Sequence, residues 1–254
     1  MSTRQDRERE FHDHRFATGP RRNARKYYAV DAGKDVYRRL VLERGGPEFR
    51  VLEYGCGTGS LALDLARSGS DVVGIDISPV ALARARKRAR RAKVGATFVE
   101  MDAQSLDFPD RSFDLVSGSG ILHHLELAPA VAEIRRVLRP GGAAVFVEPL
   151  GHNPLINVYR RFTPAMRSVD EEPLRIASIT SVTLGFRECR VQHFNLTALA
   201  GVPLRRFDRC AGLIERLHRI DQWLFARSSL ARRLAWVVVI ELIDPLDDPA
   251  TTTR

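Results

Sequence analysis

The chain has 254 residues, of which 44% are hydrophobic and 28% are charged. This composition is typical of a globular protein with one large domain, or a core domain with a small addition. No apolar run reaches the roughly 18 residues that a membrane-spanning helix needs, and the polar residues 1–6 do not resemble the start of a secretory signal. Three scattered cysteines offer neither a disulfide framework nor paired metal-ligand spacing. We therefore expect a cytoplasmic protein.

The formal net charge is +9, which invites a nucleic-acid interpretation. Arginine carries almost all of this charge, because lysine occurs only at Lys26, Lys34, Lys87 and Lys93. The densest basic run, residues 84–93, falls in an expected surface helix, where a solvated face is the simpler explanation. Nucleic acid is therefore not the expected partner, although anionic substrates and the surface of a membrane stay open as partners.

The chain begins with a polar segment. Residues 1–26 are rich in charged side chains and are broken by Gly19-Pro20, which indicates a loose arm or a mobile N-terminal lid. An amphipathic pattern over residues 27–43 then predicts a helix. We take residues 1–45 as an N-terminal arm and lid helix, and residues 46–254 as the main domain.

Strand and helix patterns alternate through the middle of the chain. Short apolar runs predict strands at residues 50–54, 71–76, 96–101, 113–117 and 143–148. Helical patterns lie between them at residues 59–68, 78–92 and 126–138. This alternation predicts right-handed crossovers and a doubly wound, mostly parallel α/β sheet with helices on both faces. Such sheets bind ligands at the carboxyl ends of their strands.

The last hundred residues follow a different pattern. A long connection with a short helix is expected over residues 149–175, followed by a helix at 174–184 and a strand at 186–194. A further helix is expected at 213–225, and the β-branched run 235–242 suits a buried strand. Residues 149–175 and 195–230 are therefore expected to form lid or insertion segments.

A glycine-rich turn follows the first predicted strand. Gly55, Gly57 and Gly59 bare the backbone, so that it can turn sharply and approach a ligand. Their spacing is G-x-G-x-G rather than the G-x-G-x-x-G of dinucleotide-binding proteins. Glu53, two residues before the first glycine, would repel a pyrophosphate but could accept a hydrogen bond from the amino group of an amino-acid ligand. The turn therefore indicates a ligand other than a dinucleotide.

Acidic and small residues end the next three strands. Asp76 can accept both hydroxyl groups of a ribose, which indicates a nucleoside without choosing between NAD and S-adenosylmethionine. Asp102 can accept from the amino group of an adenine, and the N–H of Ala103 can donate to the same base. Small residues at 117–120 would leave room for a methionine moiety. In addition, residues 138–142 (LRPGG) suit a turn from helix to strand.

Five segments have the order and spacing of a known protein family: VLEYGCGTG, GIDIS, FVEMDAQSLDF, FDLVSGSGILHHL and LRPGG. Through these segments, residues 50–148 resemble the core of the class I S-adenosylmethionine-dependent methyltransferases, and in particular the methyltransferase type 11 group. The resemblance implies a Rossmann-like sheet of seven strands whose last strand is antiparallel and lies between its neighbours. It also implies that S-adenosyl-L-methionine is the cofactor. The cofactor-binding residues that it implies are Glu53, Gly55, Cys56, Gly57, Gly59, Asp76, Ile77, Asp102, Ala103, Gly118 and Ser119.

Methyl transfer needs alignment of a nucleophile and, for some acceptors, removal of a proton. His123 and His124 are candidate bases because they follow the cofactor loop. Their structural alternative is that one histidine hydrogen-bonds the backbone while the other covers the cofactor. Glu148, which ends the fifth strand, is a further candidate that could remove a proton or orient an acceptor. His152 and Tyr159 are weaker candidates. No metal is expected.

The acceptor is expected to be a small, lipid-like molecule. The expected lid is aliphatic and poor in stacking aromatic residues, with Leu155, Ile156, Val158, Leu196, Leu199 and Leu204 as its apolar members. Tyr27 and Tyr28 are further candidates to close over the cofactor. Three alternatives stay open: an RNA methyltransferase, a protein that binds S-adenosylmethionine without transferring its methyl group, and a dehydrogenase. The sequence does not predict the oligomeric state.

Overall fold

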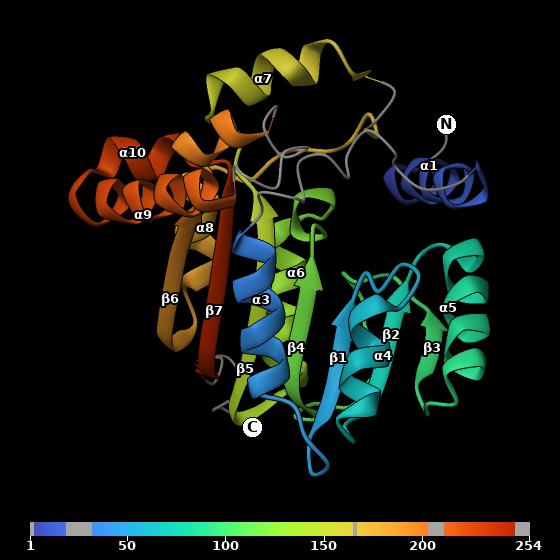
Figure 1. Ribbon diagram of the computed structural model, residues 1–254. Helices are drawn as coiled ribbons and strands as arrows, with labels where there is room; N and C mark the ends of the chain where they lie inside the picture. The colour runs from blue at the N-terminus through green and yellow to red at the C-terminus, as the bar shows by residue number, and fades with distance from the viewer. Residues whose placement is uncertain (1–2, 19–31, 165–166, 203–210, 247–254) are drawn as a thin grey trace.

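The computed structural model describes residues 3–18, 32–164, 167–202 and 211–246, and within these its strands form one seven-stranded sheet (Figure 1). The order across the sheet is β3-β2-β1-β4-β5-β7-β6. The strands are β1 (Arg50–Tyr54), β2 (Asp71–Asp76), β3 (Thr97–Glu100), β4 (Phe113–Ser119), β5 (Leu138–Pro149), β6 (Phe186–Phe194) and β7 (Val237–Pro245).

The sheet confirms the predicted fold class. Strands β1 to β5 pair in parallel, and β7 runs antiparallel to both of its neighbours, β5 and β6. The expected turn at residues 138–142 lies inside β5, where Gly141 has a φ of 76°. The pairing of β4 with β5 shifts its register between Phe113 and Leu115, beside this turn. The residues expected to form a turn before β5 are therefore part of β5.

Helices cover both faces of the sheet because successive strand side chains point to opposite sides (Figure 1). On one face, Val51 and Leu115 pack with α3 (Ala32–Glu43), α4 (Ser60–Arg67) and α5 (Pro79–Ala92). On the other face, Leu52 and Phe146 pack with α6 (Leu127–Val137), α8 (Ile176–Thr183) and α9 (Ala211–Arg227). Both faces of the parallel strands are consequently apolar and buried, as in other doubly wound sheets.

The start of the chain differs from the loose arm that sequence patterning allowed. Residues Arg4–Thr18 form helix α1, which lies above β3 and α5 at the carboxyl edge of the sheet (Figure 1). This helix lacks an apolar stripe, and charged side chains attach it: Arg7 pairs with Asp170 at 2.8 Å, and Arg9 pairs with Glu100 at 3.2 Å. A search for apolar periodicity misses such a helix because polar contacts hold it. Tyr27 and Tyr28 lie outside the described residues.

The segments after β5 are helical, and α7 (Pro154–Arg161) lies above the carboxyl edge of the sheet (Figure 1). Between β6 and β7 come the short 3-10 helix η3 (Thr197–Gly201), then α9 and α10 (Ser229–Leu234). Asp221 of α9 is fully buried and accepts hydrogen bonds from the backbone N–H groups of Leu196 and Thr197, which fixes η3 against α9. Within the described residues, no helix combines the length and the apolar character that crossing a bilayer requires.

Candidate functional site

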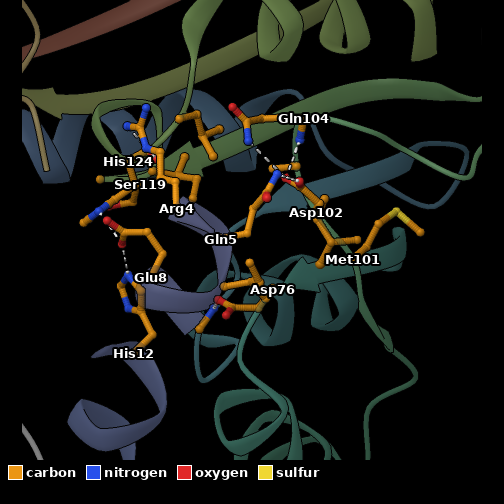
Figure 2. A pocket seen from close by; sticks show the side chains of 18 of the residues that line it. Arg4, Gln5, Glu8, His12, Asp76, Met101, Asp102, Gln104, Ser119 and His124 are labelled. Atoms are coloured by element: carbon orange, nitrogen blue, oxygen red, sulfur yellow. Dashed lines mark hydrogen bonds and ion pairs between the residues drawn. The ribbon is translucent and has the colours of Figure 1, made fainter. Parts of the chain in front are cut away.

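A pocket opens at the carboxyl ends of β1, β2 and β4, beneath helix α1 (Figure 2). Its cavity of about 220 Å³ is smaller than the roughly 300–1,000 Å³ of most small-molecule sites. The lining comes from four parts of the chain: α1, the glycine turn after β1, the ends of β2 and β3, and the segment after β4. The lining residues are Arg4, Gln5, Glu8, His12, Arg15, Phe16, Gly55, Gly57, Ile75, Asp76, Ile77, Met101, Asp102, Ala103, Gln104, Ser119, Gly120, Ile121, His124 and Leu125.

The glycine turn has the backbone conformation that requires glycine. Gly55, Gly57 and Gly59 have φ values of 61°, 51° and 69°, in the left-handed region that other residues rarely adopt. A Cβ atom on Gly55 would lie 2.7 Å from Ile121, and one on Gly57 would lie 3.3 Å from the ring of Phe16. A side chain at Gly55 or Gly57 would therefore occupy space beside the pocket where the backbone is now uncovered.

Four of the residues assigned to the cofactor lie behind the pocket lining. Cys56 and Gly118 are buried, Gly59 begins α4 against the ring of Phe98, and Glu53 is 8% exposed. The carboxylate of Glu53 accepts a hydrogen bond from the N–H of Ala62 in α4 at 2.9 Å. These residues shape and support the turn from below. Their direct contact with a cofactor stays a prediction.

The strand-end carboxylates lie in the pocket, and backbone groups orient both of them. Asp76 accepts from the N–H of Gly57 at 2.8 Å and from that of Ser78 at 2.9 Å. Burial raises the pKa of Asp76 above its ordinary value. Asp102 accepts from the N–H of Gln104 at 2.9 Å. The two carboxylates thus border the pocket at the ends of adjacent strands, and their contact with a nucleoside stays a prediction.

Helix α1 fills part of the space beside these carboxylates (Figure 2). The side-chain amide of Gln5 donates to Asp102 at 2.9 Å, on the carboxylate to which we assigned an adenine amino group. The guanidinium of Arg4 donates to the carbonyl oxygens of His124 and Asp170, each at 3.2 Å. α1 therefore covers the pocket and narrows it.

Two of the candidate bases, His123 and Glu148, do not line the pocket. Glu148 is 1% exposed, and one of its oxygens accepts from the N–H groups of Ile121 and Leu122, both at 2.9 Å. Its other oxygen lies 2.6 Å from Nδ1 of His123. Glu148 thus holds the loop after β4 in place through its backbone and through His123. A role in proton removal stays a prediction for both residues.

The next candidate base, His124, does line the pocket, and the sequence also offered it as a possible cover for the cofactor. Its ring lies 4.2 Å from that of His123, measured between centroids, and faces Glu8 and His12 of α1. Glu8 and His12 were not predicted at all, because residues 1–26 were not expected to be helical. The signal that could have found them is their i, i+4 spacing, which places both on one helix face.

Tyr54 contributes an interaction that the sequence did not predict. Its side chain is fully buried, and its hydroxyl donates to the carbonyl oxygen of Ala103. Burial raises the pKa of this phenol well above its ordinary value. The interaction joins the end of β1 to the loop after β3, so Tyr54 fixes the pocket wall beside Asp102.

The aliphatic lid residues expected from the sequence are not among those that line the pocket. Leu155 is 71% exposed and Val158 is 53% exposed, whereas Ile156 is buried below α7. Leu204 lies outside the described residues. The weaker candidates also lie away from the pocket: His152 accepts from the N–H of Ile176, and Tyr159 lies in α7. In this structure the cover over the pocket is α1.

The middle of the chain matches known proteins in sequence. Residues 52–146 match the model of a methyltransferase domain. The chain is 40% identical over 126 residues to a demethylmenaquinone methyltransferase of Chlorobaculum tepidum, which covers 49% of each protein. It is 41% identical over 112 residues to the demethylmenaquinone methyltransferase of Thermus thermophilus, covering 43% of this chain and 50% of that one. Residues 52–146 are thus similar to a methyltransferase domain, and the similarity covers less than half of the chain.

Solved structures share the fold of this chain. Phosphoethanolamine N-methyltransferase 2 of Haemonchus contortus, in complex with S-adenosyl-L-methionine, aligns with a TM-score of 0.60 at 20% identity, covering 83% of this chain and 52% of that one. The sequence matches are shorter, since the chain spans about half the length of the curated relatives that it matches. Residues 52–146, which match the methyltransferase domain, contain the glycine turn and both strand-end carboxylates.

Proposed function

We propose that this protein is an S-adenosylmethionine-dependent methyltransferase that acts on a small, lipid-like acceptor. The observation that carries the proposal is the meeting of the glycine turn with Asp76 and Asp102 in one pocket. Two further findings support it. The curated relatives named above are demethylmenaquinone methyltransferases, and a protein of the same fold was solved with S-adenosyl-L-methionine bound.

The donor set of the pocket fits the proposed cofactor. The glycine turn offers bare backbone at the two positions, Gly55 and Gly57, where a Cβ atom would close the space. Asp76 would accept from the ribose hydroxyls, while Asp102 and Ala103 would hold the adenine edge beside Ile77. For that contact, the amide of Gln5 must leave the carboxylate of Asp102. Binding of the nucleoside is therefore expected to shift α1.

The cofactor supplies a methyl group that its sulfonium has already activated for displacement. The protein's task is then to hold the acceptor in line and to exclude water. Helix α1 provides the cover, and the backbone of Ile121 and Leu122, held by Glu148, provides a rigid wall after β4. Proton removal from the acceptor by His123 remains part of the proposal.

Apolar side chains in and near the pocket are the reason for proposing a lipid-like acceptor. Met101, Ile121 and Leu125 contribute side chains to the pocket. Above the same edge of the sheet, α7 and the residue after it expose Leu155, Val158 and Phe162, the last at 83% (Figure 1). Contiguous exposed apolar side chains commonly mark a binding surface. They favour an apolar acceptor over a nucleic acid.

Methyl transfer from labelled S-adenosylmethionine tests the proposal. The purified chain would be incubated with demethylmenaquinol, with small phenols and amines, and with total tRNA, and each fraction would be counted after extraction. We expect label in an organic-soluble acceptor. Label confined to tRNA would support the RNA alternative, for which the net charge of +9 is the only argument. Calorimetry that detects NAD but not S-adenosylmethionine would contradict both.

A further inference from the structure

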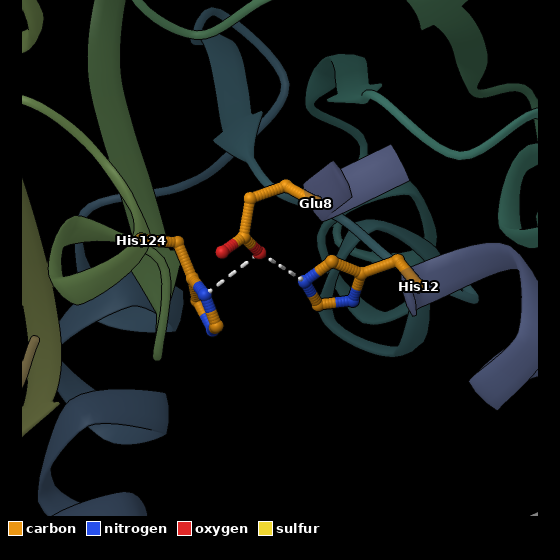
Figure 3. Close-up of side chains that lie close together, drawn as sticks. All are labelled: Glu8, His12 and His124. Atoms are coloured by element: carbon orange, nitrogen blue, oxygen red, sulfur yellow. Dashed lines mark ion pairs between the residues drawn. The ribbon is translucent and has the colours of Figure 1, made fainter. Parts of the chain in front are cut away.

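Three side chains that can bind a metal ion converge at the mouth of the pocket (Figure 3). Glu8 and His12 come from successive turns of α1, and His124 comes from the short 3-10 helix η1 (Leu122–His124). One atom, Oε2 of Glu8, lies 3.1 Å from Nδ1 of His124 and 3.5 Å from Nε2 of His12. Figure 3 shows the carboxylate of Glu8 between the two imidazole rings. All three side chains line the pocket.

Two of these atoms are buried without a hydrogen bond. Glu8 is 6% exposed and His124 is 7% exposed. Within the described residues, neither Oε2 of Glu8 nor Nδ1 of His124 makes a hydrogen bond, although they face each other. The other oxygen of Glu8 accepts from the hydroxyl of Ser168, which fixes the carboxylate. Each of the two atoms therefore has the other as its ion-pair partner at 3.1 Å, an arrangement in which one cation could be shared between them.

The two separations between Oε2 of Glu8 and the histidine nitrogens fit a tetrahedral metal ion. Bonds of about 2.0–2.1 Å to zinc place ligand atoms roughly 3.3 Å apart, between the 3.1 Å and 3.5 Å observed. The rings of His12 and His124 have centroids 5.1 Å apart, and two imidazoles on one tetrahedral ion are expected at about 5 Å. All three ligand atoms lie within 4.8 Å of one another.

We propose that Glu8, His12 and His124 form a site for a divalent transition metal of the zinc class. Two histidines and one carboxylate suit such an ion, and a set of three protein ligands leaves a fourth position open. The sequence suggested no metal, since His124 lies more than a hundred residues from Glu8 and His12, and the helical register of these two was not recognised.

The neighbouring group of His123, His124 and Glu171 also has metal-ligand spacing, but its members are already committed. Glu171 pairs with Arg160 at 2.7 Å and lies 3.7 Å from Arg167. His123 faces Glu148. A metal ion there would have to displace a guanidinium from the carboxylate. The site on α1 requires no such displacement.

The proposed ion would join α1 to the segment after β4. Without it, the described contacts that hold this end of α1 are polar side chains such as Arg4 and Arg7, the latter 44% exposed where it pairs with Asp170. Metal bonds between α1 and His124 would stabilise the conformation in which α1 covers the pocket. The inference goes beyond the proposed function, because binding of a metal does not require methyl transfer.

Metal binding by the full chain tests the proposal. Protein dialysed against a chelator would be titrated with Co²⁺, read from its visible absorption, and with Zn²⁺ in competition with a chromophoric chelator. We expect one Co²⁺ per chain with a tetrahedral spectrum that Zn²⁺ removes. Glu8→Gln, His12→Ala and His124→Ala should each weaken the affinity about 100-fold or more, since loss of an outer-shell partner alone costs about 10–100-fold.

Matched controls lie on the same helix. Glu10 and His14 are exposed residues of α1 on other faces, so Glu10→Gln and His14→Ala should leave the affinity unchanged. Hydrogen exchange provides a second readout: Zn²⁺ should slow exchange in residues 4–18 of the wild type and of both controls, but not of the three ligand variants. An affinity that is equal in wild type and ligand variants, or lost equally in the controls, overturns the proposal.

Discussion

Asp76 is the residue on which the nucleoside assignment depends most directly. Its carboxylate already accepts two backbone hydrogen bonds, and it borders the pocket at the end of β2. Removing its charge should weaken S-adenosylhomocysteine binding by about 10–100-fold, because hydrogen bonds to a charged group contribute roughly 1.5–3 kcal/mol. Calorimetry on Asp76→Asn checks this, with circular dichroism to confirm folding. Asp71→Asn, at the opposite end of the same strand, should bind as the wild type does. Equal affinities for all three proteins would contradict the ribose assignment.

Glu53 carries a charge that the fold disfavours. Burial raises its pKa to about 8, Asp76 and Asp64 add to the rise, and the N–H of Ala62 and the charge of Arg88 oppose it. The buried phenol of Tyr37 also faces this carboxyl group, and its own pKa is raised by burial. Glu53 is therefore largely protonated at neutral pH in the folded protein and largely ionised in the unfolded chain.

This difference makes stability depend on pH. The folded state binds the proton more tightly, so the free energy of unfolding should fall as pH rises from about 4.5 to about 8, by a few kcal/mol. Below about pH 4.5, Glu53 is protonated in both the folded and the unfolded state, and its favourable contribution to the free energy of unfolding is fully present. Urea unfolding of Glu53→Gln between pH 5 and pH 9 should show a flatter profile. Glu48→Gln, at an exposed position before β1, serves as control and should keep the wild-type slope.

At the scale of elements, one buried ion pair ties the end of α3 to the sheet. Arg44 lies 2.6 Å from Glu241, which is 2% exposed in the middle of β7, and Arg190 of β6 approaches it at 3.5 Å. Arg44→Ala would leave a buried carboxylate with only the more distant guanidinium. We expect a loss of about 2–4 kcal/mol in the free energy of unfolding, somewhat less than a fully unpaired buried charge costs.

The matched control for this prediction is Arg39 in α3, which pairs with Glu43 at 3.8 Å while both side chains are more than 60% exposed. Arg39→Ala should cost no more than about 0.5 kcal/mol, since exposed pairs contribute little. Urea unfolding measures both variants. Equal costs for Arg44→Ala and Arg39→Ala would show that the buried pair does not anchor α3.

At the scale of the whole molecule, the net charge and α7 together predict binding to anionic membranes. The chain carries +9, and the apolar side chains of Leu155, Val158 and Phe162 are exposed near Arg161 and Arg175, which are also exposed. Apolar insertion combined with basic residues gives peripheral binding to anionic lipid, with about 1 kcal/mol from each basic residue near the surface. Sedimentation should find more protein on vesicles that contain phosphatidylglycerol than on vesicles of phosphatidylcholine alone.

Single substitutions can locate this surface. Phe162→Asp and Leu155→Asp should reduce vesicle binding, because each would place a charge where apolar contact is expected. Leu184 is 67% exposed just before β6, at the edge of the sheet opposite α7, so Leu184→Asp should bind as the wild type does. If all three variants sediment equally, the charge alone would account for binding and α7 would have no part in it.

The sequence by itself determined the sheet and the turn. Strand β1 and helix α4 were predictable because a short apolar run and a helical period are local patterns. The glycines of the turn were predictable because the absence of a Cβ allows a left-handed conformation. The positions of Asp76 and Asp102 followed, since the carboxyl ends of parallel strands meet at one edge.

Only the tertiary structure decided what covers that edge. Helix α1 has no apolar stripe, and its contacts with Asp170, Asp102 and His124 join residues that are about a hundred or more positions apart in the chain. Glu148 makes a shorter-range contact of the same kind, since its carboxylate accepts from the backbone N–H of Ile121, 27 residues earlier in the chain. Polar contacts between distant segments depend on how side chains meet in space. No local pattern encodes them, and for this reason the cover and the metal-ligand cluster emerged only from the folded chain.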